Sequence, residues 1–390
     1  MITVYITTPG AKIFKEGDVL KVKKDGNTYH TIFPFRTEQV VAFGGVEITY
    51  RAMNVLLRNG INTVFLSKNG HYNGKLVCPY DHNILLRHMQ YKMLDDEDKC
   101  LNFCRAIAYG KIRNQFIMLQ RISRFQKKNL KRAQNEIKQI LSRVNEAGNI
   151  KSLRGYEGSA ARVYFSVFDE GFINSQDFTK RVRRPPTDPV NAVLSLLYTV
   201  LSSRVDGAVE KEGLDPYVGI FHAIGYGRRS LSLDLMEEFR TIIVDTLVFS
   251  LFNMNIISPD DFRKVHPEDN DYVECAPPQQ SDTPDILKDR MGGFGESRGD
   301  IFDDDEPPQG PKTSLEDDGH TETRMKLPVL LTPVALRKVI AQFERKLETE
   351  FTNPIDNKRI PYREAITNQV KLYIAFLRGE REDYFPLVMK

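Results

Sequence analysis

The sequence predicts an α+β protein, with a small N-terminal β-rich domain followed by a larger all-α domain. Residues 1–80 hold short β-branched and aromatic runs bounded by Gly, Pro and Asp-Gly turns, a pattern typical of strands. From about residue 84 the apolar residues recur at helical spacing instead. A chain of 390 residues suits two domains, because single cores rarely grow beyond roughly 250 residues. We place them at residues 1–80 and 84–390, the second interrupted at 266–323.

Residues 1–80 are expected to form short strands around one helix. Thr49 is a suitable N-cap for that helix, and Gly60 suits the left-handed position after its last turn. The turn at Asn69-Gly70 predicts a closing hairpin. The expected strands are residues 2–6, 19–22, 40–43, 63–66 and 74–77.

The larger domain is expected to begin with a helix that buries one apolar stripe. The residues of this stripe are Leu85, Leu86, Met89 and Met93. Order is expected again beyond residue 327, with helices at residues 336–351 and 360–377.

Residues 111–143 form a strongly basic helical segment with ten Lys or Arg and one acid. Its core face is expected to consist of Ile112, Phe116, Leu119, Ile122 and Phe125. The opposite surface is then cationic. It is either a solvated helix face or a phosphate contact, and the pattern leaves both interpretations open.

Residues 266–323 stand apart through their composition. They carry 17 Asp or Glu against four Lys or Arg, a net charge of −13, so the rest of the chain carries +16 within a total of +3. Such a segment cannot bury enough apolar surface to offset its ordering entropy, and we expect a disordered insertion. Its acidic run at 303–306 is expected to be a solvated linker rather than a metal site. A body of charge +16 suits a polyanion such as DNA.

Composition excludes several other classes of protein. The longest apolar run, Ile242–Phe252, is interrupted by Asp245 and is shorter than the roughly 18 to 20 residues of a membrane span. The N-terminus shows no signal-peptide pattern, so we expect a cytoplasmic protein without a membrane partner. Four cysteines are too few for a disulfide framework or a zinc ribbon. Cys100 and Cys104 are expected to be reduced helix cysteines rather than metal ligands.

Three side chains suggest a divalent-metal site, and these are Glu157, His222 and Glu237. Mg²⁺ and Mn²⁺ prefer carboxylate oxygens, Mn²⁺ tolerates imidazole better, and either can act on a phosphodiester. Asp234 lies three residues before Glu237 on a helix expected to run to about Phe252, so both carboxylates share one face. Each residue also has a structural explanation. Asp234 would be an acid at a helix N-terminus, Glu237 a surface acid, and His222 a core histidine.

The motifs around these residues resemble the Cas-one family, the CRISPR-associated integrase and endonuclease subunit of spacer acquisition. Two motifs carry the resemblance, GIFH at residues 219–222 and GRRSLSLDLMEEFR at 227–240. Supporting matches are RRPPTDPVNAVLSLLY at 183–198, EG at 157–158 with alanines 160–161, VVAFG at 40–44, and VFL at 64–66 through Gly70. The resemblance covers nearly the whole chain except the acidic insertion, which departs from the family's pattern.

The resemblance implies roles for single residues. Glu157, His222 and Glu237 match the family's ligands for Mg²⁺ or Mn²⁺, with glutamate at 237 where some relatives have aspartate. Asp234 matches a second acid that supports the site and completes the catalytic set. Residues that match positions near the active site, or structural and DNA contacts, are Tyr198, Asn191 and Arg184.

The resemblance also implies a mechanism and partners. The β-rich domain would serve dimerisation and the helical domain catalysis. Two homodimers would flank a dimer of a small Cas-two subunit and form a heterohexamer. Double-stranded DNA, captured as a prespacer, would attack phosphodiesters at the ends of a CRISPR repeat through its 3′-hydroxyls, with Mg²⁺ or Mn²⁺ assisting. Hydrolysis is the same chemistry with water as the nucleophile.

A cluster of basic residues is expected to contact the DNA backbone, with an ordinary surface cluster as the alternative. Phosphate contacts of this kind position DNA without reading its sequence. The residues are Lys180, Arg181, Arg183 and Arg184, together with Arg228 and Arg229 near His222.

Two other functions stay open at this point. One is a stand-alone nuclease that cleaves without joining, and the other is a catalytically idle DNA-binding scaffold. The intact set of Glu157, His222 and Glu237 argues against the scaffold. A neighbouring gene for a small partner, beside a repeat array, would argue against the lone nuclease.

We expect deletion of residues 270–320 to leave the fold intact, because their composition contributes little apolar burial. The shortened chain should express in soluble form and unfold in one cooperative transition, as followed by circular dichroism against the full chain. Loss of either property would contradict the prediction.

Overall fold

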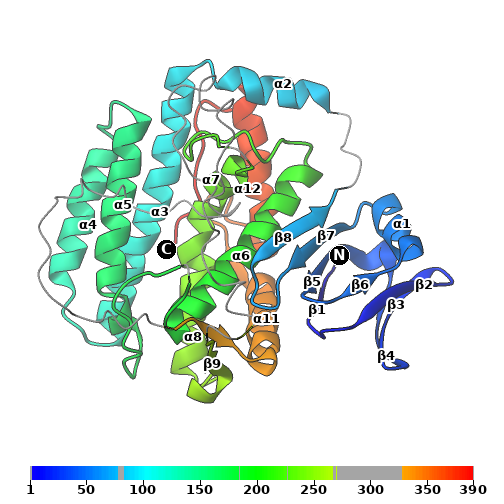
Figure 1. Cartoon of the computed structure of the whole chain (residues 1–390). Coiled ribbons are helices and arrows are strands. Elements are labelled where there is room, and N and C mark those ends of the chain that lie inside the picture. The colour runs from blue at the N-terminus through cyan, green and yellow to red at the C-terminus, as the bar shows by residue number, and fades with distance from the viewer. Residues whose placement is uncertain are drawn as a thin grey trace, which may run out of the picture.

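The computed structural model describes residues 2–77, 83–183, 185–225, 227–266, 269 and 327–389. A strand-rich N-terminal part is followed by a mostly helical part, which confirms the predicted α+β class (Figure 1). The predicted disordered insertion at 266–323 lies almost wholly outside the described residues, and so does Arg184.

Two four-stranded sheets make up the N-terminal part. The first has the order β1 (Ile2–Ile6), β5 (Thr37–Phe43), β7 (Asn62–Leu66), β8 (Tyr72–Leu76), with β1, β5 and β7 parallel and β8 antiparallel to β7. The second has the order β4 (Asn27–Ile32), β3 (Val19–Lys24), β2 (Lys12–Glu16), β6 (Glu47–Ile48). All five predicted strands are present, and the sequence analysis missed β2, β4 and β6.

Among the described residues of this part the one α-helix is α1 (Tyr50–Arg58), alongside a short 3-10 helix at Pro34–Arg36. The Thr49 hydroxyl accepts the backbone N–H of Ala52 at 3.4 Å, so the predicted N-cap is confirmed. Gly60 has a φ of +61°, the left-handed conformation predicted after the last turn. Apolar side chains of both sheets, including Ile13, and of α1 bury one small core.

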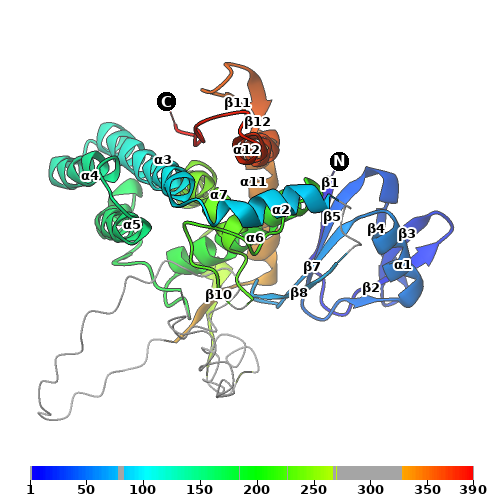
Figure 2. The ribbon, with the colours of Figure 1, turned by 90° about the horizontal axis from the view of Figure 1, so that it is seen from above.

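The helical part packs long helices around α6 and α7 (Figure 2). Its helices are α2 (Ile84–Met93), α3 (Glu97–Phe125), α4 (Lys131–Val144), α5 (Ile150–Ser166), α6 (Pro189–Lys211), α7 (Ser230–Phe239), α8 (Thr246–Asn253), α11 (Pro333–Glu348) and α12 (Tyr362–Leu377). A π-helical turn (Arg240–Asp245) joins α7 to α8, so the helix predicted to reach Phe252 is continuous. Two strand pairs complete this part, β9 (Phe262–Lys264) with β10 (Val329–Leu331), and β11 (Glu350–Thr352) with β12 (Arg359–Pro361).

Three details of the predicted helices are wrong. In α2 only Leu86 and Met93 of the expected stripe are buried, because Gln90 takes the inward position between them and donates to the carbonyls of Asp215 and Val218. Leu85 and Met89 are exposed. Phe125, in the last turn of α3, is exposed, whereas the other four residues predicted for the same core face are buried. Phe351 and Ile360 belong to the β11–β12 hairpin rather than to helices.

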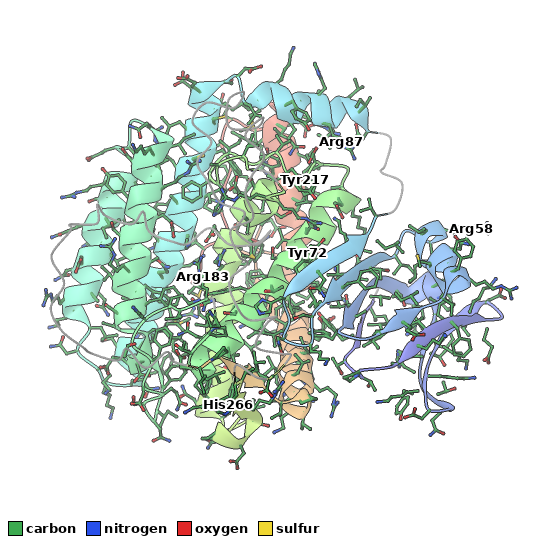
Figure 3. The ribbon with its side chains drawn as sticks, in the orientation of Figure 1. Arg58, Tyr72, Arg87, Arg183, Tyr217 and His266 are labelled. Carbon is green, nitrogen blue, oxygen red and sulfur yellow. The ribbon has the colours of Figure 1, made fainter. Side chains whose placement is uncertain are left out.

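Helix α6 is the element on which the β-rich part docks (Figure 1). Lys75 of β8 donates to Asp206 of α6 at 3.0 Å and also pairs with Glu210. The side chains of Lys75 and Asp206 are almost fully buried. Arg229 pairs with the same Asp206, and its guanidinium lies over the rings of Tyr72 and Tyr217. Figure 3 labels these two tyrosines, Tyr72 on β8 and Tyr217 in the loop after α6. By length and composition α6 could cross a membrane, but most of its apolar stretch is buried here as a core helix.

The C-terminal residues are held against α3 and α7 by the Glu238 side chain. Its carboxylate accepts hydrogen bonds from Gln369 at 2.7 Å, from the Tyr384 hydroxyl at 2.6 Å and from the backbone N–H of Leu387. Asn114 of α3 donates to the Leu387 carbonyl at 2.9 Å. Burial raises the pKa of Glu238 to about 7, although these hydrogen bonds act in the opposite direction.

We therefore expect Glu238→Gln to change how stability depends on pH. The folded-state pKa of Glu238 is raised above its unfolded value of 4.5, so the folded protein keeps a proton that the unfolded chain loses between pH 4.5 and about 7. As the pH rises from 4.5 to about 7, the free energy of unfolding of the wild type should fall by roughly 3 kcal/mol relative to that of the variant. Urea denaturation at several pH values measures the difference. The control is Glu136→Gln on the exposed face of α4, and parallel curves for Glu238→Gln and wild type would refute the expectation.

Candidate functional site

The predicted site residues converge where α3, α5 and α7 meet. Glu157 lies on α5, Glu237 on α7, and His222 in the loop that leads into α7. The Nε2 atom of His222 is 3.6 Å from Oε1 of Glu237. Glu157 and Glu237 face each other across one side chain that the sequence analysis did not single out, Lys111 of α3.

Lys111 bridges the two carboxylates. Its Nζ atom is 2.5 Å from Oε1 of Glu157 and 2.7 Å from Oε2 of Glu237, and its side chain is only 4% exposed. The sequence analysis counted Lys111 among the residues of a cationic outer surface, and for this residue that is wrong. The usable signal was its spacing, because Cys104, Ala108, Lys111 and Gln115 recur as one buried stripe of α3.

Asp234 holds the loop that carries His222. Its carboxylate accepts the backbone N–H groups of Ile220 at 2.7 Å, Phe221 at 3.0 Å and His222 at 2.8 Å. It also lies 2.6 Å from Nδ1 of His222. Asp234 is fully buried, so the helix dipole considered for it from the sequence is not what explains its position.

The same loop is fixed from its other side. Arg154, one turn before Glu157 on α5, donates to the carbonyls of Phe221 at 2.5 Å and Ile220 at 3.3 Å. A Cβ atom on Gly219 would lie 2.3 Å from the backbone of Ser230, so only glycine allows the loop to pack so closely on the first turn of α7. Residues 220–222 are therefore clamped between two helices.

These contacts decide the tautomer of His222. An ionised carboxylate only accepts hydrogen bonds, so Nδ1 of His222 donates to Asp234. Nε2 is then the ring nitrogen that faces Glu237, 3.6 Å away. A carboxylate that orients a histidine in this way is typical of the surroundings of metal ligands.

Glu237 is ionised although it is buried. Burial opposes its ionisation, but Arg240, Lys111 and His222 together outweigh burial and lower the pKa of Glu237 to about 2. The Arg240 Nε atom is 3.1 Å from Oε1 of Glu237, the oxygen on the side away from Lys111.

Arg240, the first residue of the π-helical turn, is itself held by an aromatic side chain. Its guanidinium lies 4.8 Å from the centre of the Tyr198 ring. The hydroxyls of Tyr198 and Tyr164 donate to the two oxygens of Asp245, at 2.6 and 2.9 Å. Burial raises the pKa of Asp245, against the effect of these hydrogen bonds. Tyr198 thus lies near the site, one side chain removed from Glu237.

The donor set fits a divalent cation in type. Among the described residues, no three His, Cys, Asp or Glu side chains converge tightly enough to hold a metal ion as they stand, since Lys111 lies between Glu157 and Glu237. Yet Oε1 of Glu157 and both carboxylate oxygens of Glu237 are buried, and they lie against side-chain nitrogens that carry or can carry positive charge, those of Lys111, Arg240 and His222. Two carboxylates and an imidazole nitrogen are ligands that suit Mg²⁺ or Mn²⁺.

Comparison with known proteins identifies the family of this chain. The family model described as CRISPR associated protein Cas1 matches residues 4–269. The chain belongs to the Cas1 family. A protein of Chlorobaculum tepidum named CRISPR-associated endonuclease Cas1 1 is 37% identical over 269 residues, which cover 67% of this chain and 78% of the relative. A Thermus thermophilus protein named CRISPR-associated endonuclease Cas1 3 is 29% identical over 99% of this chain and 97% of its own length.

Solved structures show the same Cas1 fold. A CAS1 protein from Thermotoga maritima superposes with a TM-score of 0.73 at 18% identity over the full length of both chains. A casposase bound to integration product superposes with a TM-score of 0.75 at 18% identity, over 99% of this chain and 93% of the casposase.

The basic residues predicted to contact DNA differ in how this Cas1 chain places them. Lys180 is exposed, and Arg183 and Arg228 are half-buried. Arg181 donates to Asn191 at 2.8 Å and to Ser195 at 2.9 Å. Arg229 is buried on Asp206. Burial favours a structural role for Arg229 over the DNA contact expected from the sequence.

Asn191 joins the loop that holds Lys180, Arg181 and Arg183 to the start of α6. Its amide nitrogen donates to the Lys180 carbonyl and to Asp188, and its Oδ1 accepts from the backbone N–H of Val182. Asp188 in turn caps α6. Asn191 is fully buried, so its contacts are structural.

Cys100 and Cys104 are free and buried on α3, as predicted. Burial raises the pKa of Cys100 to about 11 and raises that of Cys104 still further. Cys78 and Cys275 lie outside the described residues.

We expect Asp234→Asn to lower the free energy of unfolding by roughly 1–3 kcal/mol, because the single amide oxygen cannot replace a carboxylate that accepts three backbone N–H groups and a histidine. Chemical denaturation of the variant measures the loss. The matched control is Asp260→Asn at an exposed position, which should change stability by less than about 0.5 kcal/mol. Equal stability of Asp234→Asn and wild type would contradict the structural role.

Proposed function

We propose that this protein is a metal-dependent DNA endonuclease and integrase, which inserts captured DNA fragments into a CRISPR array. The observation that carries the proposal is the buried meeting of Glu157 and Glu237 on the Lys111 ammonium, with His222 beside Glu237. Such a set is suited to charge neutralisation at a phosphodiester. The names of the relatives, CRISPR-associated endonucleases, support the same class of reaction.

Glu157, His222 and Glu237 are the residues that would hold Mg²⁺ or Mn²⁺. The bound ion would neutralise charge on the phosphate oxygens as the nucleophile attacks. Asp234 would keep Nε2 of His222 aimed at the ion site, through the Nδ1 contact at 2.6 Å. Arg240 would keep Glu237 ionised and fixed, since it pairs with one carboxylate oxygen and stacks on Tyr198.

The proposed reaction is a transesterification. The 3′-hydroxyl oxygen of the captured fragment forms a bond to a phosphorus atom at the end of a repeat, and the bond from that phosphorus to the repeat's own 3′-oxygen breaks. The hydroxyl proton leaves the nucleophile, and the departing 3′-oxygen takes up a proton. One phosphodiester is exchanged for another, so the reaction needs no high-energy co-substrate. With water as the nucleophile, the same groups would hydrolyse DNA.

Double-stranded DNA is the proposed substrate, both as the captured prespacer and as the CRISPR repeat. Outside the acidic segment the chain carries +16, and phosphate contacts by such a body release condensed counterions. Lys180 is exposed beside the start of α6, and Arg183 and Arg228 are partly accessible, so these are the basic residues we propose for backbone contact. Arg181 would act by shaping the loop that carries them.

We further propose that the protein works as a homodimer and with a small Cas-two subunit, in a heterohexamer. The support is likeness of fold to a solved Cas6-RT-Cas1–Cas2 complex, with a TM-score of 0.75 at 22% identity over 99% of this chain and 36% of that chain. That title names an assembly of the matched protein. For this chain the partner is a proposal.

A strand-transfer assay tests the function. Purified protein with its small partner, Mn²⁺ or Mg²⁺, a labelled duplex with free 3′-hydroxyls and a supercoiled plasmid carrying the repeat should yield label joined to plasmid. Glu157→Ala, His222→Ala and Glu237→Ala should each reduce joining by about a thousandfold or more, because a bound divalent ion contributes several kcal/mol to transition-state stabilisation.

Glu364→Ala, at an exposed position on α12, is the control and should keep full activity. Cleavage without joining would replace the integrase by a nuclease. DNA binding with neither reaction would leave a scaffold.

A further inference from the structure

The Lys111 ammonium occupies the position that a metal ion shared by Glu157 and Glu237 would take. Its Nζ atom lies within 2.7 Å of both Glu157 and Glu237, in the space where any ion shared by these two carboxylates would have to lie. An ammonium and a divalent ion repel each other strongly at such short range in a buried site. Both cannot occupy the space between the carboxylates.

The two carboxylates on either side of Lys111 are already neutralised without a divalent ion. Glu157 and Glu237 contribute two negative charges, and Lys111 and Arg240 contribute two positive charges. Because buried charges are stable only when they are paired, this balance lets the folded chain keep both carboxylates ionised. An entering divalent ion would therefore add two charges to a neutral set unless one of the two cations gives way.

Lys111 is the cation that can give way. Arg240 is held by the ring of Tyr198 and by Glu237, three residues away on the same continuous helix. Lys111 has a flexible four-carbon stem and a compact ammonium. Glu157 is the most exposed member of the site, at 11% of its side chain, so the ammonium can turn toward solvent past Glu157 while its backbone stays fixed in α3.

We propose that Lys111 is a built-in competitor for the metal ion, and this inference rests on the metal site of the proposed function. The ammonium neutralises Glu157 and Glu237 before the ion arrives and leaves at least one of them when the ion binds. Metal affinity is then weaker than the carboxylates alone would give. The released ammonium lies at the rim of the site, where a phosphate oxygen of DNA can take the place of the carboxylate it has left.

The test measures Mn²⁺ binding to the full chain without DNA, by electron paramagnetic resonance of the free ion. Lys111→Met keeps the length of the side chain and removes its charge. It should bind Mn²⁺ about tenfold or more tightly than the wild type, because no buried ion pair has to be broken. Lys138→Met, the same change on the exposed face of α4, should bind as the wild type does. Equal or weaker binding by Lys111→Met would overturn the inference.

Thermal unfolding gives a second readout that does not depend on activity. In EDTA, Lys111→Met should melt below the wild type, because two buried carboxylates lose their shared partner. Saturating Mn²⁺ should raise its melting temperature by more than it raises that of the wild type. An equal rise in both proteins would count against competition.

Lys111→Gln provides a neutral variant with a hydrogen-bond donor if the methionine variant does not fold, and the same gain in Mn²⁺ affinity is expected. Failure of the inference can be told apart from failure of the proposed function. If Glu157→Gln weakens Mn²⁺ binding while both Lys111 variants bind as the wild type does, the metal site stands and the competition is refuted. If the wild type and the Lys111 variants all fail to bind Mn²⁺, both proposals fall.

Discussion

The shared pairing of Lys111 with Glu157 and Glu237 is the interaction on which the centre of this protein depends. It joins α3, α5 and α7 through ionised groups that are almost completely buried. Buried charges without partners are costly, so each of the three helices must keep the register that brings its residue to this point. The proposed chemistry and the helix packing therefore rest on the same atoms.

Helix α7 contributes both to the candidate site and to the packing of the C-terminal residues. Every one of its residues is buried, and two adjacent glutamates serve opposite sides. Glu237 faces the cations of the site, and its pKa is lowered to about 2, whereas burial raises the pKa of Glu238 to about 7 as it holds the C-terminal residues. The π-helical turn that follows carries Arg240 toward Glu237 and Asp245 toward Tyr198. Such turns often occur at functional sites.

The β-rich part is tied to this centre through α6. Asp206 of that helix accepts contacts from Lys75 on β8 and from Arg229 in the loop before α7. The loop between α6 and α7 therefore carries both His222, which lies at the site, and Arg229, which pairs with the residue that Lys75 of β8 contacts.

The sequence by itself determined the local features, the family and the residues of the candidate site. Thr49 and Gly60 bound α1 because capping depends on neighbouring residues only. The motifs at 219–222 and 227–240 identified His222, Asp234 and Glu237, since their order along the chain carries the resemblance. The tertiary structure decided which charges are buried. Lys111 and Arg229 look like surface cations in the sequence, and both are buried because acids from distant helices face them. Helical spacing fixes the face on which a residue lies, but only the packing of the other helices decides what that face meets.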